Sequence, residues 1–362
     1  MRIAILGTRG IPNNYGGFEQ LAQYLSIGLL NKGHEVFVYS SSRHPYKQRS
    51  WNGIHIIHKY DPEKEVGTVG QFIYDLNCIV DSRRRKFDSI LNLGYTSSSV
   101  WMKFFDKKTR VITNMDGLEW KRTKYSDKVK KFLMYAEKLA VKGSTHLVSD
   151  SLAIKKYLYD KYQAESTFIA YGANLFKEAD FGVLNQYKIE EYKYNLLIAR
   201  MEPENNIEMI LDGVAKSKID FPFLVIGNHK NKFGTYLKSK FEGNKKIIFT
   251  GSIYDELIIN NLRYYSNLYF HGHSVGGTNP SLLEAMGCSS LIAAHKNEFN
   301  ESVLESDAFY FTNDDEVKSI LDSKTKLSNE AKSMVLKNYS KIESSYSWDK
   351  IVQQYEEILV KP

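Results

Sequence analysis

Cysteine is nearly absent from this sequence. Only Cys78 and Cys288 occur among 362 residues, and they lie far apart. Two separated cysteines exclude a disulfide framework and a cysteine-ligated metal cluster, and they are typical of a reducing compartment. No run approaches the roughly 18 consecutive apolar residues of a membrane-spanning helix, and the apolar run 3–6 is too short for a secretory leader. We therefore expect a cytoplasmic protein without a membrane span of its own.

Several signatures of catalysis and binding are missing as well. The sequence has no Gly-x-Gly-x-x-Gly dinucleotide motif, no Walker lysine, no Gly-x-Ser-x-Gly elbow and no His-Glu-x-x-His. No Asp-x-Asp triplet is present to hold a metal-bound nucleotide; Asp61-x-Glu63 comes closest, in a charged stretch that indicates a solvated loop. His271 and His273 share one side of a strand, but no third ligand lies at metal spacing. We expect neither a metal nor another cofactor.

What remains is the composition of a soluble globular protein. With 43% hydrophobic and 25% charged side chains, the 362 residues are neither disordered nor fibrous, and they fit two domains of roughly 150–200 residues. The net charge of +7 is uneven, because residues 1–180 hold 28 Lys+Arg and 18 Asp+Glu (+10) while residues 181–362 hold the other 21 and 24 (−3). Such a basic half is expected to meet something anionic. Charge alone leaves nucleic acid, a membrane surface and a phosphate-bearing substrate open, but no zinc finger, RNA-binding signature or arginine-rich arm supports nucleic acid.

Short apolar runs alternate with amphipathic segments along most of the chain. Strands are expected at 2–7, 35–39, 54–57, 89–93, 110–113, 146–149, 194–199, 223–227, 247–251 and 268–270, and the clearest helices at 18–32, 128–141, 206–216 and 280–286. This alternation predicts an α/β fold with two doubly wound, Rossmann-like parallel sheets. The polar stretch 172–192 separates the two series and marks the domain boundary. Two such sheets would face one another across a cleft at the carboxyl ends of their strands, where these folds bind ligands.

A glycine-rich loop, residues 7–17, lies between the first strand and the first helix. Its four glycines would let backbone amides approach an anion at a helix N-terminus. A tight turn with flexible glycines explains the same pattern without any ligand.

A single arginine, Arg200, follows the strand expected at 194–199. An arginine at the carboxyl end of a parallel strand is placed to hold a diphosphate with its planar guanidinium. Arginines at such positions are more often surface ion-pair partners, so Arg200 alone is a weak signal.

The strongest motif is the small, polar loop 271–279, which leads directly into a helix. The amides near Gly277, Thr278 and Asn279 are placed to bind phosphate oxygens with help from the helix dipole. Glu284 lies one turn into that helix, where it can accept hydrogen bonds from sugar hydroxyls. The alternative is that Thr278 or Asn279 only caps the helix and that Glu284 lies on a solvated face.

Two neighbouring segments of the first half carry charge together with aromatic side chains. Residues 114–122 place two carboxylates, an indole and two cations after a strand, which suits a sugar or a phosphate-linked acceptor but also an ordinary surface turn. Segment 121–142 is rich in lysine. Its apolar positions 129, 132, 133, 136, 139 and 140 form one helical stripe, which predicts contact with the domain core. The opposite, basic face is then free to rest on anionic lipid head groups.

Taken together, these loops resemble a known family. The chain is similar to glycosyltransferases of GT-B architecture in glycosyltransferase family 4, and more narrowly to bacterial rhamnosyltransferases of capsule and exopolysaccharide assembly. The similarity is carried, in order, by residues 7–19, 116–122, 200–206 and 272–285, and it spans almost the whole chain.

The resemblance implies a retaining, metal-independent transfer of a sugar from a nucleotide diphosphate donor, with a lean to L-rhamnose from dTDP-rhamnose. The expected acceptor is a lipid-diphosphate-linked saccharide, with the enzyme peripheral on the inner face of the membrane. The acceptor would bind domain 1–172, the nucleotide sugar would bind domain 173–345, and the last helix, 346–362, would pack back on the first domain.

The resemblance also assigns roles to individual residues. Arg200, Asp116 and Glu119 are expected to be catalytic. The expected donor and phosphate ligands are Gly16, Gly17, Arg200, Gly276, Gly277, Thr278, Asn279 and Glu284. The expected acceptor ligands are Tyr15, Asp116, Glu119 and Trp120.

Two departures from the wider family bear on this assignment. The first of its paired glutamates falls at Gly276, and its diphosphate lysine falls at Asn205. Other contacts to sugar and phosphate must replace them, and the narrower rhamnosyltransferase group shares both changes. The alternatives are the same chemistry with a UDP- or GDP-sugar, a nucleotide-sugar epimerase, or a non-catalytic scaffold that binds glycans or anions.

Overall fold

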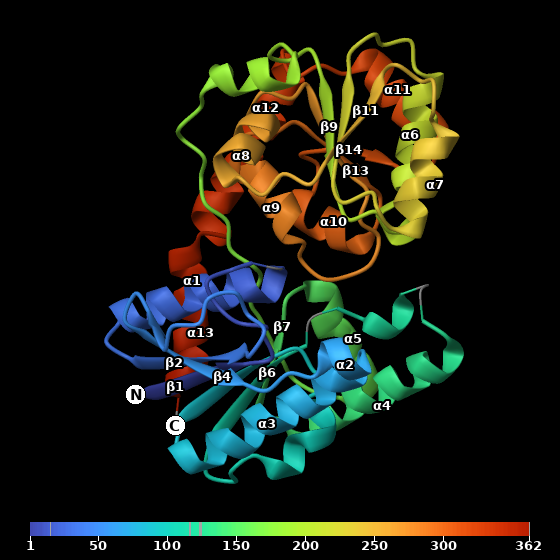
Figure 1. Ribbon diagram of the computed structural model, residues 1–362. Helices are drawn as coiled ribbons and strands as arrows, with labels where there is room; N and C mark the ends of the chain where they lie inside the picture. Colours follow the sequence, from blue (N-terminus) through green and yellow to red (C-terminus); the bar gives the residue numbers. More distant parts are fainter. Residues whose placement is uncertain (15, 116, 123–124, 362) are drawn as a thin grey trace. The chain divides into compact units, whose positions relative to one another are not determined.

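The computed structural model describes residues 1–14, 16–115, 117–122 and 125–361, and each of its two compact units is an α/β structure built on one sheet (Figure 1). Unit 1 comprises Met1–Gly172 and Trp348–Pro362, and unit 2 comprises Ala173–Ser347. The predicted fold class is confirmed. The cleft expected between the two sheets stays a prediction.

Unit 1 is built on an eight-stranded sheet with the order β3-β4-β2-β1-β5-β6-β7-β8. Its strands are β1 (Arg2–Leu6), β2 (Glu35–Ser41), β3 (Ser50–Trp51), β4 (Ile54–Lys59), β5 (Ser89–Leu93), β6 (Arg110–Asn114), β7 (His146–Ser149) and β8 (Thr167–Phe168). All pairs are parallel except β3 with β4. Because parallel sheets are covered on both faces, a central strand such as β1 is apolar and buried along most of its length.

Helices connect these strands and cover the sheet. They are α1 (Gly17–Asn31), α2 (Glu63–Val66), α3 (Val69–Arg85), α4 (Asp127–Gly143), α5 (Leu152–Tyr162) and the 3₁₀ helices η1 (Ser99–Phe104) and η2 (Glu119–Lys121). Helix α3 packs with Tyr74, Cys78 and Ile79 against the side of β1 that carries Ala4 and Leu6. Gly7, at φ +82°, lets the chain leave β1 beside β5, because a Cβ there would lie 2.1 Å from the Leu93 carbonyl oxygen.

The last helix, α13 (Trp348–Val360), belongs to unit 1. It begins two residues after the expected start at 346, and it lies against α1 (Figure 1). The rings of Trp348 and Tyr24 stack with centroids 4.3 Å apart. At the other end of α13, the Ser89 hydroxyl donates to the Leu359 carbonyl at 2.6 Å. Unit 1 is therefore completed by a helix from the far end of the sequence.

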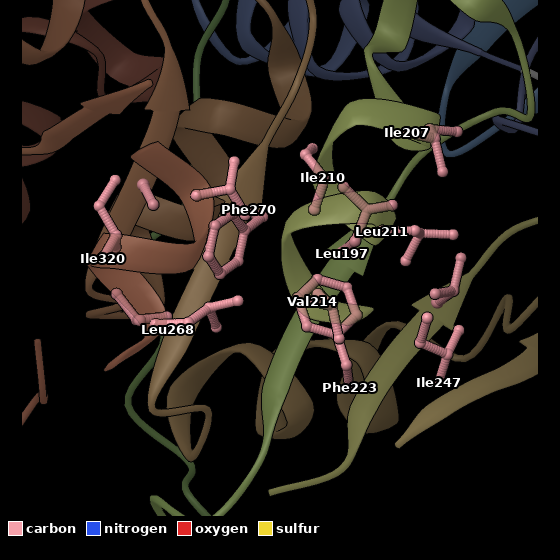
Figure 2. Packing of buried hydrophobic residues seen from close by; sticks show 14 of the residues in the cluster. Leu197, Ile207, Ile210, Leu211, Val214, Phe223, Ile247, Leu268, Phe270 and Ile320 are labelled. Atoms are coloured by element: carbon pink, nitrogen blue, oxygen red, sulfur yellow. The ribbon is translucent and has the colours of Figure 1, made fainter. Parts of the chain in front are cut away.

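Unit 2 contains a six-stranded parallel sheet with the order β11-β10-β9-β12-β13-β14. Its elements are β9 (Asn195–Ile198), β10 (Phe223–Ile226), β11 (Ile247–Gly251), β12 (Leu268–His271), β13 (Ile292–His295), β14 (Phe309–Phe311), α6 (Ile207–Lys216), α7 (Lys232–Lys240), α8 (Glu256–Tyr264), α9 (Pro280–Gly287), α10 (Glu298–Leu304), α11 (Asp314–Ser323), α12 (Asn329–Ser345), η3 (Phe181–Tyr187) and η4 (Pro203–Asn205). Figure 2 shows one core of this unit, where side chains of α6 meet those of β9, β10 and β12. The Phe223 and Phe270 rings lie 5.4 Å apart in it.

Helix α4 differs from the stripe predicted for segment 121–142. Leu133, Ala136 and Ala140 are buried as expected, but Val129 and Phe132 are exposed. The buried side of the helix also includes Glu137, which is 1% exposed. The polar residue Glu137 therefore occupies part of the buried face that the periodicity assigned to apolar residues alone. Among the described helices, none is both long and apolar enough to cross a membrane.

Candidate functional site

Each sheet reverses its strand order at one place, and these two places organise the candidate site residues. In unit 1 the reversal lies between β1 and β5, and in unit 2 it lies between β9 and β12. The loops after such strands diverge and leave a crevice at the carboxyl edge of the sheet, which is where α/β folds bind ligands. Arg200 and the loop 272–279 follow β9 and β12, so the structure brings these predicted residues to one edge.

The two loops of unit 2 are joined by several hydrogen bonds. The Asn206 side-chain amide donates to the Gly272 carbonyl at 2.8 Å. The Ser274 hydroxyl and its backbone N–H donate to the Glu204 carbonyl at 2.8 and 3.1 Å. A Cβ on Gly272 would lie 2.0 Å from the Asn205 carbonyl oxygen, so only glycine permits this approach. The loops after β9 and β12 therefore hold each other in place.

Arg200 has an exposed side chain at this edge. Its carbonyl accepts from the Asn205 side-chain amide at 2.7 Å and from the Glu202 backbone N–H at 2.8 Å. Asn205 is 4% exposed. The residue at the position of the family's lysine thus holds the backbone of the Arg200 loop with its amide group.

Residues beyond the predicted motifs hold the other side of the loop. Asn297 and Asn300, at the start of α10, donate from their side-chain amides to the His273 carbonyl at 3.0 and 3.1 Å. His271 is fully buried and stacks on His273 with ring centroids 4.5 Å apart. Burial holds the pKa of His271 well below its ordinary range, so the ring is neutral. Sequence reasoning missed both asparagines, whose only signal is their place after the strand β13.

The start of α9 is capped by one of its predicted residues. The Asn279 side chain accepts from the Ser281 backbone N–H at 3.0 Å, and Pro280 occupies the first turn. Asn279 therefore caps the helix, and its role as a phosphate ligand stays a prediction. Residues 280–283, all of which the structure describes, include no carboxylate, so the positive end of the helix dipole is not neutralised from within the first turn.

Glu284 is not on a solvated face. Its side chain is 28% exposed, and it accepts from the Arg263 guanidinium at 2.6 Å. The Arg263 side chain is 3% exposed and also donates to the Asn260 side chain at 3.0 Å. Burial works to lower the pKa of Arg263, but the Glu284 carboxylate, together with Tyr269 and Cys288, outweighs it and the pKa is raised. Arg263 therefore fixes the orientation of Glu284, and no motif predicted this pair.

The glycine-rich loop of unit 1 is arranged differently. The Glu19 carboxylate, on the first turn of α1, accepts from the Arg9 backbone N–H at 2.8 Å and from the Thr8 hydroxyl at 3.2 Å. Glu19 is buried, and Gly16 precedes the helix in an extended conformation. A carboxylate of the chain itself thus lies at this helix start. The roles of Gly16 and Gly17 stay predictions, and Tyr15 lies outside the described residues.

Other carboxylates line the same edge of unit 1. Asp61 is buried and accepts from the Ser41 hydroxyl at 2.6 Å, so the interpretation of this stretch as a solvated loop was wrong. Asp75 accepts from the Ser97 hydroxyl at 2.6 Å, next to the end of β5. Burial raises the pKa of Asp75 to about 7. This edge therefore offers acceptors of hydrogen bonds.

Two of the predicted acceptor residues, Glu119 and Trp120, lie together after β6. Glu119 pairs with the Arg122 guanidinium at 2.8 Å. The Trp120 ring lies 6.1 Å from the Tyr157 ring and 5.5 Å from the Lys161 ammonium. Side chains of α5 thus pack against the Trp120 indole. Asp116 lies outside the described residues. The acceptor role of this group stays a prediction.

Comparisons with known proteins bear on the fold and on the two halves of the chain. Residues 1–174 match the family model "Domain of unknown function (DUF1972)", and residues 184–341 match "Glycosyl transferases group 1". Among proteins with curated descriptions, none matches the chain. Solved structures match over its whole length. The fold is that of GT-B glycosyltransferases.

Three of these GT-B structures illustrate the likeness. Sucrose-phosphate synthase from Thermosynechococcus elongatus is 14% identical, with 99% of this chain and 98% of that chain covered and a TM-score of 0.77. Anabaena HepE in complex with UDP-glucose is 13% identical, with 99% of both chains covered and a TM-score of 0.75. WaaG, a glycosyltransferase involved in lipopolysaccharide biosynthesis, is 11% identical, with both chains fully covered and a TM-score of 0.71. The group 1 match lies within unit 2, where Arg200 and the loop 272–279 meet.

Proposed function

We propose that the protein is a retaining glycosyltransferase that uses a nucleotide diphosphate sugar. One observation carries the proposal: the loop that bears Arg200 is hydrogen-bonded to the loop that leads into α9, at the point where the sheet of unit 2 reverses. A guanidinium and an unneutralised helix N-terminus at one crevice suit a diphosphate. The group 1 match over residues 184–341 supports the same assignment.

The chemistry follows from the charge that develops during transfer. The bond between the anomeric carbon and the phosphate oxygen breaks, and its electron pair leaves with the nucleoside diphosphate. Arg200 and the amides of residues 276–279 stabilise that departing charge, which is the main electrostatic task of such a site. The acceptor oxygen attacks from the face that the diphosphate leaves, and its proton passes to the departing phosphate, so the configuration is retained. No metal takes part in this scheme.

Glu284 binds the sugar ring of the nucleoside in this proposal. Its carboxylate accepts hydrogen bonds from ribose or deoxyribose hydroxyls, while Arg263 keeps it from turning away. The carboxylate edge of unit 1 receives the acceptor, with Tyr15, Asp116, Glu119 and Trp120 as its expected ligands and with Asp116 and Glu119 taking part in catalysis. Loop 10–17 closes over the phosphates and the sugar.

The finer assignment is L-rhamnose from dTDP-rhamnose, transferred to a lipid-diphosphate-linked saccharide in surface polysaccharide assembly. It rests on the resemblance of residues 7–19, 116–122, 200–206 and 272–285 to bacterial rhamnosyltransferases. HepE, which was solved in complex with UDP-glucose, keeps UDP-sugars among the candidates to be tested.

The first experiment ranks dTDP, UDP, GDP and ADP by the thermal shift each gives, since a ligand that binds only the folded state raises its melting temperature. The donor is then offered with a lipid-diphosphate saccharide, with and without EDTA. Product that forms equally in EDTA supports the proposal. Turnover of the nucleotide sugar without acceptor would indicate an epimerase instead, and binding without turnover of any donor would indicate a scaffold.

A further inference from the structure

Two arginines of unit 1 follow neighbouring strands, and the proposed function leaves both of them unused. Arg9 follows β1, and Arg43 follows β2. The two strands pair in parallel, and beyond them the Ser41 backbone N–H donates to the Arg9 carbonyl at 3.0 Å. A Cβ on Gly10 would lie 2.4 Å from the Ser40 hydroxyl oxygen, so the two loops approach this closely only with glycine at position 10. The backbones that carry the two arginines are therefore held together at the carboxyl edge of the sheet.

Each of these guanidinium groups is paired with a carboxylate of α2. The Arg9 guanidinium donates to Glu63 at 2.9 Å, and the Arg43 guanidinium donates to Glu65. Both arginines reach solvent, since their side chains are 36% and 29% exposed. Because each pair is neutral, the arginines leave the sign of this edge unchanged. Two carboxylates, each bound by its own arginine, offer acceptors like those of the two phosphoryl groups of a diphosphate.

Helix α2, which supplies the two carboxylates, is held mainly by polar contacts. The structure describes all four of its residues, and none is buried. It lies beside α3 (Figure 1), where the Gln71 side-chain amide donates to the Glu63 carboxylate at 2.8 Å. The hydrogen bond from Arg43 lowers the pKa of Glu65, so this carboxylate is charged. Exposed ion pairs contribute little to stability. An anion that accepts from both arginines can therefore exchange with the two carboxylates.

The direction of Arg43 does not depend on its ion pair. Asp61 is 5% exposed, and its carbonyl accepts from Arg43 Nε at 2.7 Å. The Asp61 carboxylate accepts from the Ser41 hydroxyl at 2.6 Å and from the Glu63 backbone N–H at 3.0 Å. A buried residue thus anchors the guanidinium through Nε and leaves its terminal nitrogens to an anion. The same residue fixes the start of α2, so that only the side chain of Glu65 has to turn away from Arg43.

These contacts indicate which ligand the arginines fit. The proposed function assigns the diphosphate of the donor to Arg200, and it provides no cation for the diphosphate of the acceptor. We propose that Arg9 and Arg43 bind the acceptor's diphosphate, which takes the places of the Glu63 and Glu65 carboxylates. The inference deepens the proposed function and rests on it for the identity of the acceptor. Because an arginine fork binds phosphate in a bidentate manner, a ligand with two phosphoryl groups displaces both carboxylates, whereas a neutral glycoside displaces neither.

Binding of inorganic pyrophosphate tests the subsite without turnover. The full chain with Arg200→Ala is used, so that the donor site contributes less, and the thermal shift given by millimolar pyrophosphate is measured. Adding Arg43→Gln should remove most of that shift, whereas adding Glu65→Gln should increase it. The matched control is Arg83→Gln, an exposed arginine of α3, which should leave the shift unchanged. Equal shifts with Arg43→Gln and Arg83→Gln would overturn the proposal.

Kinetics with two acceptors show which diphosphate binds there. Arg43→Gln should raise the KM for a lipid-diphosphate saccharide about ten-fold or more, and Glu65→Gln should lower it. Arg43→Lys, which keeps the charge without the fork, should fall between Arg43→Gln and wild type. The KM for the alkyl glycoside of the same saccharide and the KM for the donor should stay unchanged in all three variants. A raised donor KM would assign the arginines to the donor's diphosphate, and an equal rise for both acceptors would indicate a structural role; either result would overturn the proposal.

The two experiments separate this inference from the proposed function. Pyrophosphate binding that depends on Arg43, without sugar transfer to any acceptor, would remove the proposed function and leave the anion subsite in place. Sugar transfer to both acceptors that Arg43→Gln leaves unchanged would do the reverse.

Discussion

In each unit, the charge at the carboxyl edge of the sheet is opposite in sign to the net charge of the sequence half that forms the unit. Residues 1–180 have a net charge of +10, yet the edge of unit 1 collects the buried carboxylates of Glu19 and Asp61. Residues 181–362 have a net charge of −3, yet the edge of unit 2 presents Arg200 and the start of α9. Net charge therefore describes the outer surface, whereas the chemistry of a site is decided by a few side chains at the ends of strands.

The N-termini of α1 and α9 differ in the same way as the two sheet edges. Both α1 and α9 follow a glycine-rich loop, and the sequence presents both as anion sites. At α1, Glu19 already accepts from Arg9 N–H and the Thr8 hydroxyl. At α9, the cap is the neutral side chain of Asn279. A diphosphate would bind more favourably at the second helix start than at the first, which favours unit 2 as the principal donor site.

The largest effect is expected from Arg200→Ala. If Arg200 stabilises the departing diphosphate, its loss should lower kcat/KM about 10²–10³-fold, with the circular dichroism spectrum unchanged. Arg49→Ala, an exposed arginine of unit 1, is the control and should leave kcat/KM within about two-fold of wild type. If the Arg200 variant turned over as fast as wild type, the charge difference between the two edges would no longer support the proposed function.

Glu284→Ala should lower the free energy of unfolding by about 3 kcal/mol, because it leaves the buried Arg263 guanidinium without its carboxylate. Urea unfolding measures this loss. Pairing Glu284→Met with Arg263→Met should recover much of it, since the buried charge is then gone. The double variant should still have a raised KM for the nucleotide sugar. Normal donor KM in a folded double variant contradicts the assignment of Glu284 to the nucleoside.

Asp75 should make the stability of unit 1 depend on pH. Unlike Glu284, which is ionised and paired with Arg263, Asp75 is a buried acid that burial keeps protonated. Its pKa is raised to about 7 from the ordinary value of 3.8, so its contribution to stability is complete below pH 3.8 and is lost as the pH rises to about 7. Wild type should lose about 2 kcal/mol more than Asp75→Asn between pH 5 and pH 7. Parallel stability curves for the two proteins, measured by urea unfolding, would show that Asp75 is ionised in the folded state.

The smallest effect is expected from Gly276→Ala. Gly276 has φ +126°, and a Cβ there would have no atom within 4 Å, so the cost is backbone strain of about 1 kcal/mol. Gly243→Ala in the same unit, at φ +88° and equally open, is the matched control. Both should lower the melting temperature to a similar extent, but only the change at 276 should raise the KM for the donor. Equal donor KM for both variants would separate loop 272–279 from the diphosphate.

Local pattern predicted the sheets because a buried parallel strand is encoded by its own residues. Strands β5, β7 and β11 have the predicted bounds, and the other predicted strands differ by one or two residues at their ends. Strands β3, β8, β13 and β14 were missed; three of them have only two or three residues, which is too short to carry a periodicity. Helix α4 was placed correctly, but the buried Glu137 shifted its apolar stripe in a way that only the tertiary partners Tyr157, Lys161 and Tyr162 explain.

The residues of the candidate site likewise fall into those that local sequence predicted and those that depend on tertiary contacts. Arg200 and loop 272–279 were found because each follows an apolar strand directly, and parallel strands bring such loops to one edge. The pair of Arg263 with Glu284 and the capture of Arg9 N–H by Glu19 join residues 21 and 10 positions apart. No spacing rule anticipates them, because the partners meet only after the helices have packed.

The placement of α13 has a consequence for how the protein is made. The first 172 residues leave the ribosome early, but the side of α1 with Tyr24 and Gly28 stays uncovered until Trp348 and Val352 have been synthesised. During that interval unit 2 is synthesised in full, and the side of α1 that α13 later covers is open to a chaperone or a protease. Unit 2, whose residues 173–347 are contiguous, is the first of the two to have all its parts.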